Sequence, residues 1–409
     1  MTENKKEVKI ASGIVLALLL IYTIYSFIFS FRTIKESVKN VISITSVNEL
    51  KEVLSESSEN IGDHVAFHDR FIDGYGMINR ILGKNEINNF GIITDEVGMM
   101  YYGSVYVSPL DDVDEIVDNT ARLADMVHEQ GKDFVVVLPP SKILYGVSEV
   151  DCDLPLNNPN PRMDKYLWGL QQRQIDTIDL RNPFVESGLP IEELFFKTDH
   201  HWTAQGAFIG TSYFVDKLNE KYGYNLDPDN YYRNLDNYNI VRYYDKMLGT
   251  HGRNSGLPYS GVDDFDIITL KDFENTDFSY EDKDSSGNGD YREGTAIDAL
   301  YDWVQLDDPT DYKQNLYAIY LHSITSHETM INRNNPDGLK VVVCRDSYFS
   351  PMTVFMAPMV GEVDLYYGQD AEGKEGFLDR IEEGDYDLVV LEIYPYNIKY
   401  KTVDLFGDD

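Results

Sequence analysis

Cysteine and histidine are scarce in this chain, which has two cysteines and eight histidines among 409 residues. Cys152 and Cys344 cannot supply the repeated ligand spacing of a zinc site. Cys344 falls in an apolar stretch typical of a buried strand, whereas Cys152 falls in a loop rich in Pro, Asn and Asp. Two inert thiols are favoured over a disulfide, although a bridge can form outside a cell. We therefore expect neither a metal ion nor another cofactor.

Basic residues are also few. Seventy acidic residues face 35 Lys and Arg, for a formal charge of −35. Such a surface repels nucleic acid and anionic lipid headgroups, so we expect no nucleic-acid partner. The simplest interpretation of the acidity is solubility. Because 43% of the residues are apolar and 13% aromatic, the chain has enough apolar surface for a packed core and is not a disordered chain.

One long hydrophobic run stands near the N-terminus. Residues 10–31, IASGIVLALLLIYTIYSFIFSF, contain no charge. As a helix this run is about 33 Å long, enough to cross a bilayer. It ends in aromatic residues rather than small ones, which favours an uncleaved anchor over a signal peptide. The sequence thus predicts a cytoplasmic tail (1–9), a transmembrane helix, a helical stalk (32–60) and a large domain (61–409) outside the cytoplasm. Basic residues flank both ends of the run, so the orientation is inferred mainly from the chemistry below.

The large domain alternates helical periodicity with continuous apolar segments. Strands are expected within 132–142, 175–180 and 339–347, and a helix followed by a strand within 376–395. Further helices are expected within 114–131 and 161–174. This alternation predicts an α/β fold, a flavodoxin-like parallel sheet with helices on both faces. Residues 220–335 are rich in Tyr, Asn and Asp, and predict an insertion of long loops and hairpins over one edge of the sheet.

Two polar turns are the candidate functional segments. Ligands bind beyond the carboxyl ends of parallel strands. The turn RDSY (345–348) follows one expected strand, and DHHW (199–202) follows another after a short loop. If both turns face one crevice, they bring together the nucleophile Ser347, the base His201 and the orienting acid Asp199.

The spacing within DHHW supports that assignment. In extended backbone, Asp199 and His201 point to the same side, so one segment delivers base and orienter together. His200 is then expected to point away and to serve packing or substrate binding. Trp202 is expected to hold the segment rigid and is also a candidate for substrate contact. The alternative is that Asp199 caps the helix that begins near Thr203 and that the histidines have no catalytic role.

Several stretches resemble a known family. DHVAFHDRF, KTDHHWT, LGTHGRNSG and VVVCRDSYFSP are similar to segments of the DHHW family of envelope proteins. That family resembles in turn the alginate O-acetyltransferases of the SGNH-hydrolase superfamily. The resemblance implies an SGNH-like fold, with Asp199 and His201 as acid and base and Ser347 as nucleophile.

The sequence departs from the superfamily pattern next to the serine. Arg345 stands where many SGNH enzymes have a glycine, and no clear Gly and Asn blocks supply the usual oxyanion hole. The N–H of Ser347 or Tyr348 is a candidate donor, and a second donor is expected from residues 249–256. In that stretch Arg253 is either a substrate ligand or a surface side chain.

Residues 282–293, DKDSSGNGDYRE, place acidic and polar side chains at the ligand positions of an EF-hand calcium loop. An EF-hand needs a helix on each side and an apolar residue at position eight, where Gly289 stands. The flanks are more typical of two strands around a polar turn. The sequence therefore favours a hairpin over a calcium site.

Three functions fit the sequence. The favoured one is a membrane-anchored extracellular O-acyltransferase that transfers an acetyl group to a polysaccharide. Because acetyl donors are scarce outside cells, a partner must pass the group across the membrane, and the resemblance implies a membrane-bound O-acyltransferase. The alternatives are a carbohydrate acetylesterase with the same triad and a non-catalytic envelope or polysaccharide-binding protein.

Overall fold

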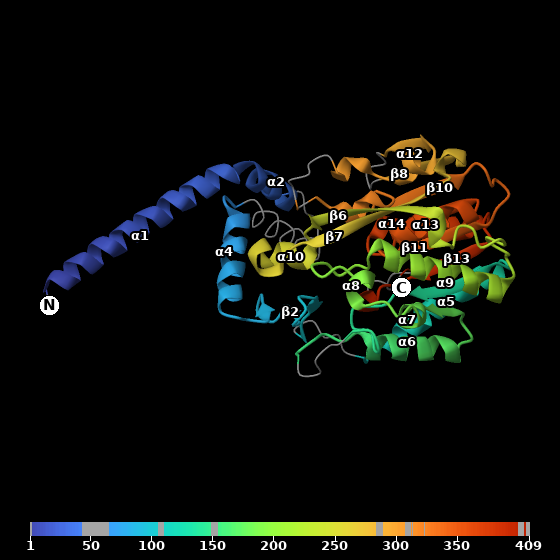
Figure 1. Cartoon of the computed structure of the whole chain (residues 1–409), viewed down its shortest axis with the longest axis horizontal. Helices are drawn as coiled ribbons and strands as arrows, with labels where there is room; N and C mark the ends of the chain where they lie inside the picture. The colour runs from blue at the N-terminus through green and yellow to red at the C-terminus, as the bar shows by residue number, and fades with distance from the viewer. Residues whose placement is uncertain are drawn as a thin grey trace. The chain divides into compact units, whose positions relative to one another are not determined.

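A computed structural model describes residues 2–42, 65–104, 110–148, 154–283, 289–306, 312, 314–322, 324–399 and 405 (Figure 1). The chain divides into two compact units, Met1–Ile81 and Leu82–Asp409, and each is described by itself. Cys152 and residues 43–60 of the predicted stalk lie outside the described residues.

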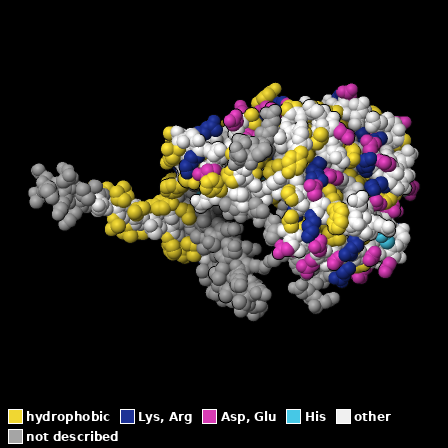
Figure 2. All heavy atoms as spheres, turned by 90° about the horizontal axis from the view of Figure 1, so that it is seen from below, with side chains coloured by type: hydrophobic (Ala, Val, Ile, Leu, Met, Phe, Trp, Pro, Cys, Tyr) yellow, Lys and Arg dark blue, Asp and Glu magenta, His cyan; other side chains and the backbone are white. Residues whose placement is uncertain are grey.

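The first unit consists of helices in its described parts: α1 (Thr2–Phe29), α2 (Phe31–Ile42) and α4 (His68–Ile81). The segment Ser12–Phe29 of α1 is long and apolar enough to cross a membrane. Hydrophobic side chains cover this part of α1 (Figure 2). The Tyr22 hydroxyl donates to the backbone oxygen of Ala66 over 3.0 Å, and the Tyr22 ring meets Phe71 edge to face. The helix thus fits the predicted single-pass anchor, and equally a signal sequence.

The second unit is built on an eight-stranded sheet with the order β5-β4-β13-β11-β12-β10-β8-β9. Its strands are β4 (Asp133–Leu138), β5 (Thr177–Asp179), β8 (Phe278–Lys283), β9 (Tyr291–Gly294), β10 (His327–Asn332), β11 (Lys340–Arg345), β12 (Glu362–Tyr367) and β13 (Leu388–Glu392). The first five strands of this order are parallel, and the last three pair antiparallel. The strand β11, which leads to Ser347, therefore lies inside the sheet rather than at an edge.

Helices cover both faces of the sheet. Alternate residues of β4 pack into separate cores, Val135 and Val137 into one and Phe134 and Val136 into the other. Such alternation is what a strand buried on both faces requires. The first core also holds α9 (Ala204–Tyr222) and α13 (Phe349–Met356), and the second holds α5 (Val113–Glu129), α6 (Asn160–Gln172) and α14 (Ala371–Glu383). The predicted α/β architecture is confirmed.

The helix α9 shows how local sequence sets an element's ends. Thr203 has extended backbone, and its hydroxyl accepts from the N–H of Gly206 over 3.1 Å. This is an N-cap bond, and it occupies Thr203 rather than Asp199. At the other end Gly223 has a left-handed φ of 74°, which glycine adopts without steric cost. The alternative that Asp199 caps this helix is therefore wrong.

The region 220–335 contains hairpins, as expected, but it also enlarges the sheet. Strands β6 (Tyr238–Met247) and β7 (Asp263–Leu270) form a separate two-stranded ribbon. By contrast, β8 and β10 pair with each other, and β10 pairs with β12 of the central sheet. β8 and β9 flank the EF-hand-like stretch as antiparallel strands, which confirms the hairpin interpretation. The EF-hand's flanking helices are thus replaced by strands.

The remaining short elements are β1 (Glu86–Ile87), β2 (Ile92–Thr94), β3 (Met100–Tyr102), α7 (Arg181–Glu186), α8 (Ile191–Leu194), α10 (Thr250–Ser255), α11 (Leu257–Ser260) and α12 (Ala296–Leu300). The strands β1 to β3 form a small antiparallel sheet.

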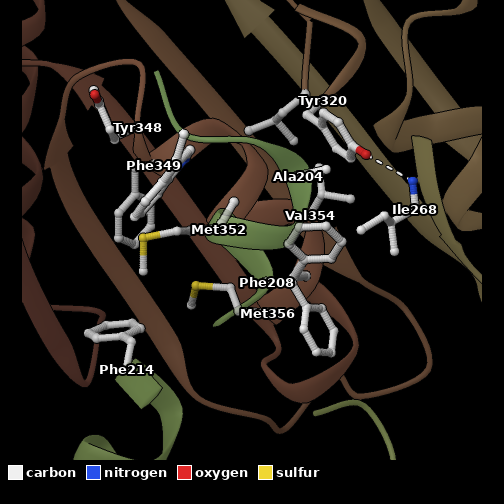
Figure 3. Close-up of a cluster of buried hydrophobic side chains, with 14 of the residues drawn as sticks. Ala204, Phe208, Phe214, Ile268, Tyr320, Tyr348, Phe349, Met352, Val354 and Met356 are labelled. Atoms are coloured by element: carbon white, nitrogen blue, oxygen red, sulfur yellow. Dashed lines mark hydrogen bonds between the residues drawn. The ribbon is translucent and has the colours of Figure 1, made fainter. Parts of the chain in front are cut away.

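We expect Phe214→Ala to lower the free energy of unfolding by about 3–5 kcal/mol, the usual cost of removing a buried Phe side chain. Phe214 is fully buried on α9, and its ring lies 6.1 Å from that of Phe349 on α13 (Figure 3). Denaturant unfolding of the full chain, followed by tryptophan fluorescence, measures the change. Tyr244→Ala, at a side chain 73% exposed on β6, is the control and should change the free energy by less than about 1 kcal/mol.

Candidate active site

Two segments that are distant in the sequence meet at the C-terminal edge of the parallel strands. Ser347 lies in the turn between β11 and α13, and DHHW lies between α8 and α9. The ring Nε2 of His201 is 2.6 Å from the hydroxyl oxygen of Ser347. The ring Nδ1 of His201 is 2.6 Å from a carboxylate oxygen of Asp199. The structure thus brings together the three residues that the sequence selected.

Electrostatics fix the direction of these hydrogen bonds. Burial alone raises the pKa of Asp199, but the neighbouring histidines and the Thr250 N–H outweigh it and hold this pKa well below its ordinary value. An ionised carboxylate only accepts hydrogen bonds, so the Nδ1–H of His201 donates to it. The Nε2 of a neutral His201 is then the acceptor for the Ser347 hydroxyl. This is the tautomer in which an imidazole can take the proton of a serine.

The DHHW segment is held by bonds to its backbone. Phe195 and Trp202 form an antiparallel bridge, and the Trp202 indole N–H donates to the Tyr317 hydroxyl over 3.0 Å. The carboxylate of Asp263 accepts from the N–H of Lys197, the N–H of Thr198 and the Thr198 hydroxyl, at 2.6–2.8 Å. These contacts fix the backbone just before Asp199. Trp202 therefore serves rigidity, as expected, and it does not line the cavity described below.

His200 does not point away from its neighbours as extended backbone would require. Its ring centre lies 3.9 Å from that of His201, and its Nδ1 is 3.4 Å from Asp199. Residues 197–201 form a series of bends instead of a strand, which accounts for this direction. Burial, followed by the charge of His201, lowers the pKa of His200 well below its ordinary value. His200 is thus a neutral ring beside the candidate base.

The turn that carries Ser347 is anchored through Asp346. The Asp346 carboxylate accepts from the N–H groups of Tyr348 and Tyr394 at 3.1 and 2.9 Å, and from the Asn397 amide at 3.0 Å. The Asp346 N–H donates to the buried Glu392 over 2.8 Å. Burial and the neighbouring Asp346 raise the pKa of Glu392 well above its ordinary value, which favours the neutral acid. The end of β13 therefore holds the serine turn.

Arg345, which stands where the superfamily pattern has a glycine, connects neighbouring elements through its side chain. Its side chain is buried, forms an ion pair with the buried Glu328 of β10 and donates to the Ser350 hydroxyl over 2.8 Å. The substitution therefore joins β11 to β10 and to the start of α13 beneath the serine turn.

The candidate donors for the oxyanion hole differ in whether they already make hydrogen bonds. The N–H of Tyr348 already donates to Asp346, and its buried hydroxyl donates to the backbone oxygen of His200. Tyr348 thus offers no free donor, which corrects the expectation. Within the part of the chain that the structure describes, the N–H of Ser347 makes no hydrogen bond and is the better candidate. Arg253 bonds to Leu248 and Thr250 in its own loop and does not line the cavity.

A cavity of about 500 Å³ opens beside Ser347 and His200. Its wall includes aromatic and amide side chains that the sequence analysis did not select: Tyr102, Asn157, Tyr367, Gln369, Tyr394, Tyr396 and Asn397. Tyr394, Tyr396 and Asn397 directly follow β13, so the rule that ligands lie beyond strand ends was a usable signal for them. Tyr102 and Asn157 come from a hairpin and a loop, for which the sequence carried no such signal.

A metal ion is a weaker interpretation of the same side chains. Asp199, His200 and His201 offer ligand atoms within 4.8 Å of one another. However, one oxygen of Asp199 accepts from His201 and the other accepts from the Thr250 N–H over 2.6 Å. Both ring nitrogens of His201 are also engaged. An ion would have to replace these bonds, so the site is better suited to proton transfer than to metal binding.

This arrangement, a serine at the end of an inner parallel strand facing an Asp-x-His segment, is the one that the resemblance to SGNH-like proteins implies. Comparison with known proteins agrees. Residues 100–235 match the family model described as "SGNH hydrolase-like domain, acetyltransferase AlgX". No curated protein has significant sequence similarity to the chain. The predicted resemblance is confirmed, and with it the class of enzyme, an SGNH-like acyltransferase or esterase.

Solved structures share the fold. Bacillus cereus PatB1, solved with a sulfonyl adduct, is 18% identical with a TM-score of 0.61, and the match covers 78% of this chain and 99% of that one. A DHHW family protein from Eubacterium siraeum is 13% identical with a TM-score of 0.56, covering 79% of this chain and 96% of that one. At these identities the likeness establishes the architecture.

Gly249→Ala should disrupt the site without replacing Ser347, His201 or Asp199. A Cβ at Gly249 would lie 2.3 Å from the Cβ and 2.6 Å from the Cα of Asp199, so the two loops must separate. We expect labelling of Ser347 by a fluorophosphonate to slow roughly 10²-fold, the cost of an error of about 1 Å in a catalytic geometry. Gly74→Ala, where a Cβ meets nothing within 4 Å, is the control. Equal labelling rates in both variants would contradict the dependence of Ser347 on this loop.

His251 should make the fold sensitive to acid. Burial, then the charge of Lys142, lowers the pKa of His251 from 6.5 to about 3. Between these values the unfolded chain binds a proton that the folded chain excludes, so the free energy of unfolding falls as the pH falls. From pH 6.5 to pH 5 the loss is about 2 kcal/mol. His251→Phe keeps a ring against Tyr102 and should flatten this slope in denaturant unfolding measured at several pH values. An unchanged slope would contradict the assignment.

Proposed function

We propose that the chain is a membrane-anchored O-acyltransferase that acetylates a polysaccharide outside the cytoplasm through Ser347, His201 and Asp199. The observation that carries the proposal is the chain of two 2.6 Å contacts from Ser347 through His201 to Asp199, at the wall of a cavity. A serine hydroxyl is a weak nucleophile until an adjacent base accepts its proton. These contacts support His201 as the base and Asp199 as the orienter in that step.

The reaction has two halves. The Ser347 oxygen attacks the carbonyl carbon of the acyl donor while Nε2 of His201 takes the hydroxyl proton. His201 then returns this proton to the departing group, which leaves an ester on Ser347. In the second half a sugar hydroxyl gives its proton to His201 and attacks the ester, and the proton returns to the Ser347 oxygen. Asp199 stabilises the imidazolium in both halves.

The negative oxygen formed in each half requires hydrogen-bond donors. The N–H of Ser347 is the first candidate. His200 lies at the cavity wall as a neutral ring, and we assign it to the substrate side, where it contacts the acyl donor or the sugar. Tyrosines and amides in the wall suit a polar ligand with flat apolar faces, because such sites combine aromatic surface with a few oriented polar groups.

The substrate and the location are supported by different observations. The matching family model is named for an acetyltransferase, which supports an acetyl group. The apolar segment Ser12–Phe29 supports a single-pass anchor. An anchor keeps the catalytic domain beside a membrane partner, and we propose a membrane-bound O-acyltransferase as the supplier of acetyl groups.

Acetylation of Ser347 by an activated ester is the direct test. After incubation with p-nitrophenyl acetate, mass spectrometry should find one acetyl group on Ser347 in the native chain and none in Ser347→Ala. His201→Ala should slow acylation roughly 10⁴–10⁶-fold, as loss of a triad member does elsewhere. The control is Ser212→Ala, whose hydroxyl bonds only within α9. Acylation of His201→Ala at the native rate would eliminate His201 as the base.

The same acyl-enzyme separates transferase from esterase, the alternative that the hydrolase-like family description favours. The chain is incubated with the activated ester and with candidate oligosaccharides. Acetyl groups on the sugar identify a transferase. Release of acetate at the same rate with and without sugar identifies an esterase.

A further inference from the structure

Lys142 is a buried cation that the proposed reaction does not use. It follows β4 in the stretch PPSK, and its side chain is only 4% exposed. Burying an ammonium group is costly unless its hydrogen bonds are replaced. The buried ammonium group of Lys142 therefore needs hydrogen-bond partners inside the protein.

The ammonium group of Lys142 joins two segments. It donates to the backbone oxygen of Met100 over 2.8 Å and to that of Lys197 over 3.0 Å. The N–H of Met100 also donates to the Lys197 oxygen over 3.0 Å. Lys197 stands two residues before Asp199, so Lys142 and β3 together fix the start of the segment that carries Asp199 and His201.

Charged and titratable groups surround Lys142 on several sides. Asp263, at the start of β7, Asp199 and Asp95 act on it as anions, and the ring of Tyr101 lies 6.0 Å away. The charge of Lys142 also acts on His200 and His251. Asp263 in turn accepts three hydrogen bonds from Lys197 and Thr198. One buried ammonium thus interacts electrostatically with three carboxylates.

We propose that Lys142 is a positioning residue of the active site: its charged side chain clamps the loop that presents Asp199 and His201 to Ser347. The clamp is an ion-dipole contact to two carbonyl oxygens, and it requires the charged form, since a neutral amine holds carbonyl oxygens less strongly. The inference rests on the proposed acyl transfer for its activity readout.

The charge requirement gives the clamp a pH signature. Burial lowers the pKa of Lys142 to about 8, although Asp263, Asp199 and Asp95 oppose the shift. As the pH rises through this value the ammonium loses its proton and the clamp loosens. The acylation rate of Ser347 should therefore fall on the alkaline side with a midpoint near pH 8.

Lys142→Met tests the clamp because it keeps the length of the side chain and removes the charge. We expect the acylation rate at pH 7 to fall roughly 10²-fold through misplacement of the loop, and the alkaline decline to disappear. Lys340→Met is the matched control: it removes a cation from a surface pair with Asp385 at the far end of β11 and should leave rate and pH profile unchanged.

Asp263→Asn is a second variant, which should shift the alkaline decline instead of removing it. Asp263 is the largest influence that raises the pKa of Lys142, so its neutral replacement should move the alkaline midpoint to lower pH. A role of Lys142 in folding alone would lower the thermal transition of Lys142→Met but would leave the midpoint in Asp263→Asn where it is. Native rates and an unchanged alkaline limb in Lys142→Met would overturn the proposal.

A readout without catalysis separates this inference from the proposed function. In the Ser347→Ala chain, ¹³C NMR of the lysine side chains should show one lysine that titrates near pH 8, and this signal should be absent when Lys142→Met is added. The downfield ring N–H proton of His201, bonded to Asp199, should shift in the same double variant. If the native chain is not acylated but both NMR results hold, the proposed function fails and the clamp stands; if neither holds, the clamp fails.

Discussion

The site depends on one short contact, the 2.6 Å hydrogen bond between His201 and Ser347, which joins positions 146 residues apart. No local interaction can create it. It exists because β5 and β11 are parallel strands of one sheet, so the loops after them emerge at the same edge. The bond also sets a tolerance, since a shift of about 1 Å in either loop would lose it. Many of the hydrogen bonds near the site hold the two loops within this distance.

Each side of the contact is held by backbone hydrogen bonds to buried carboxylates. Asp346 ties the serine turn to the segment after β13, and Asp263 ties the DHHW segment to the start of β7. Asp199 itself links the DHHW segment to the N–H of Thr250. A buried carboxylate that accepts two or three N–H groups is held in one position. These hydrogen bonds also offset the free-energy cost of removing the charge from water. The acidic composition of the chain is thus partly architectural and not only a matter of solubility.

The sequence predicted features that are set by neighbouring residues. It missed features that are set by contacts between distant segments. The apolar segments before Ser347 and after Gly384 specify buried strands by composition, and Asp-x-His keeps base and orienter in one segment whatever the fold. The bends at residues 197–201, by contrast, arise from contacts with Asp263 and other distant partners, so the direction of His200 was not predictable. The same holds for β10, whose antiparallel pairing with β12 is set by tertiary contacts and not by periodicity. The position of Tyr102 in the cavity wall is likewise set by tertiary contacts and not by its local sequence.

The pair of adjacent histidines is consistent with this electrostatic arrangement. In the proposed reaction His201 becomes an imidazolium beside Asp199. A second positive ring 3.9 Å away would oppose that step, because like charges at such a distance repel strongly at low dielectric. Burial keeps His200 neutral, so it can lie against His201 and still contact substrate at the cavity wall. Two histidines can therefore serve one site only because one of them is prevented from carrying charge.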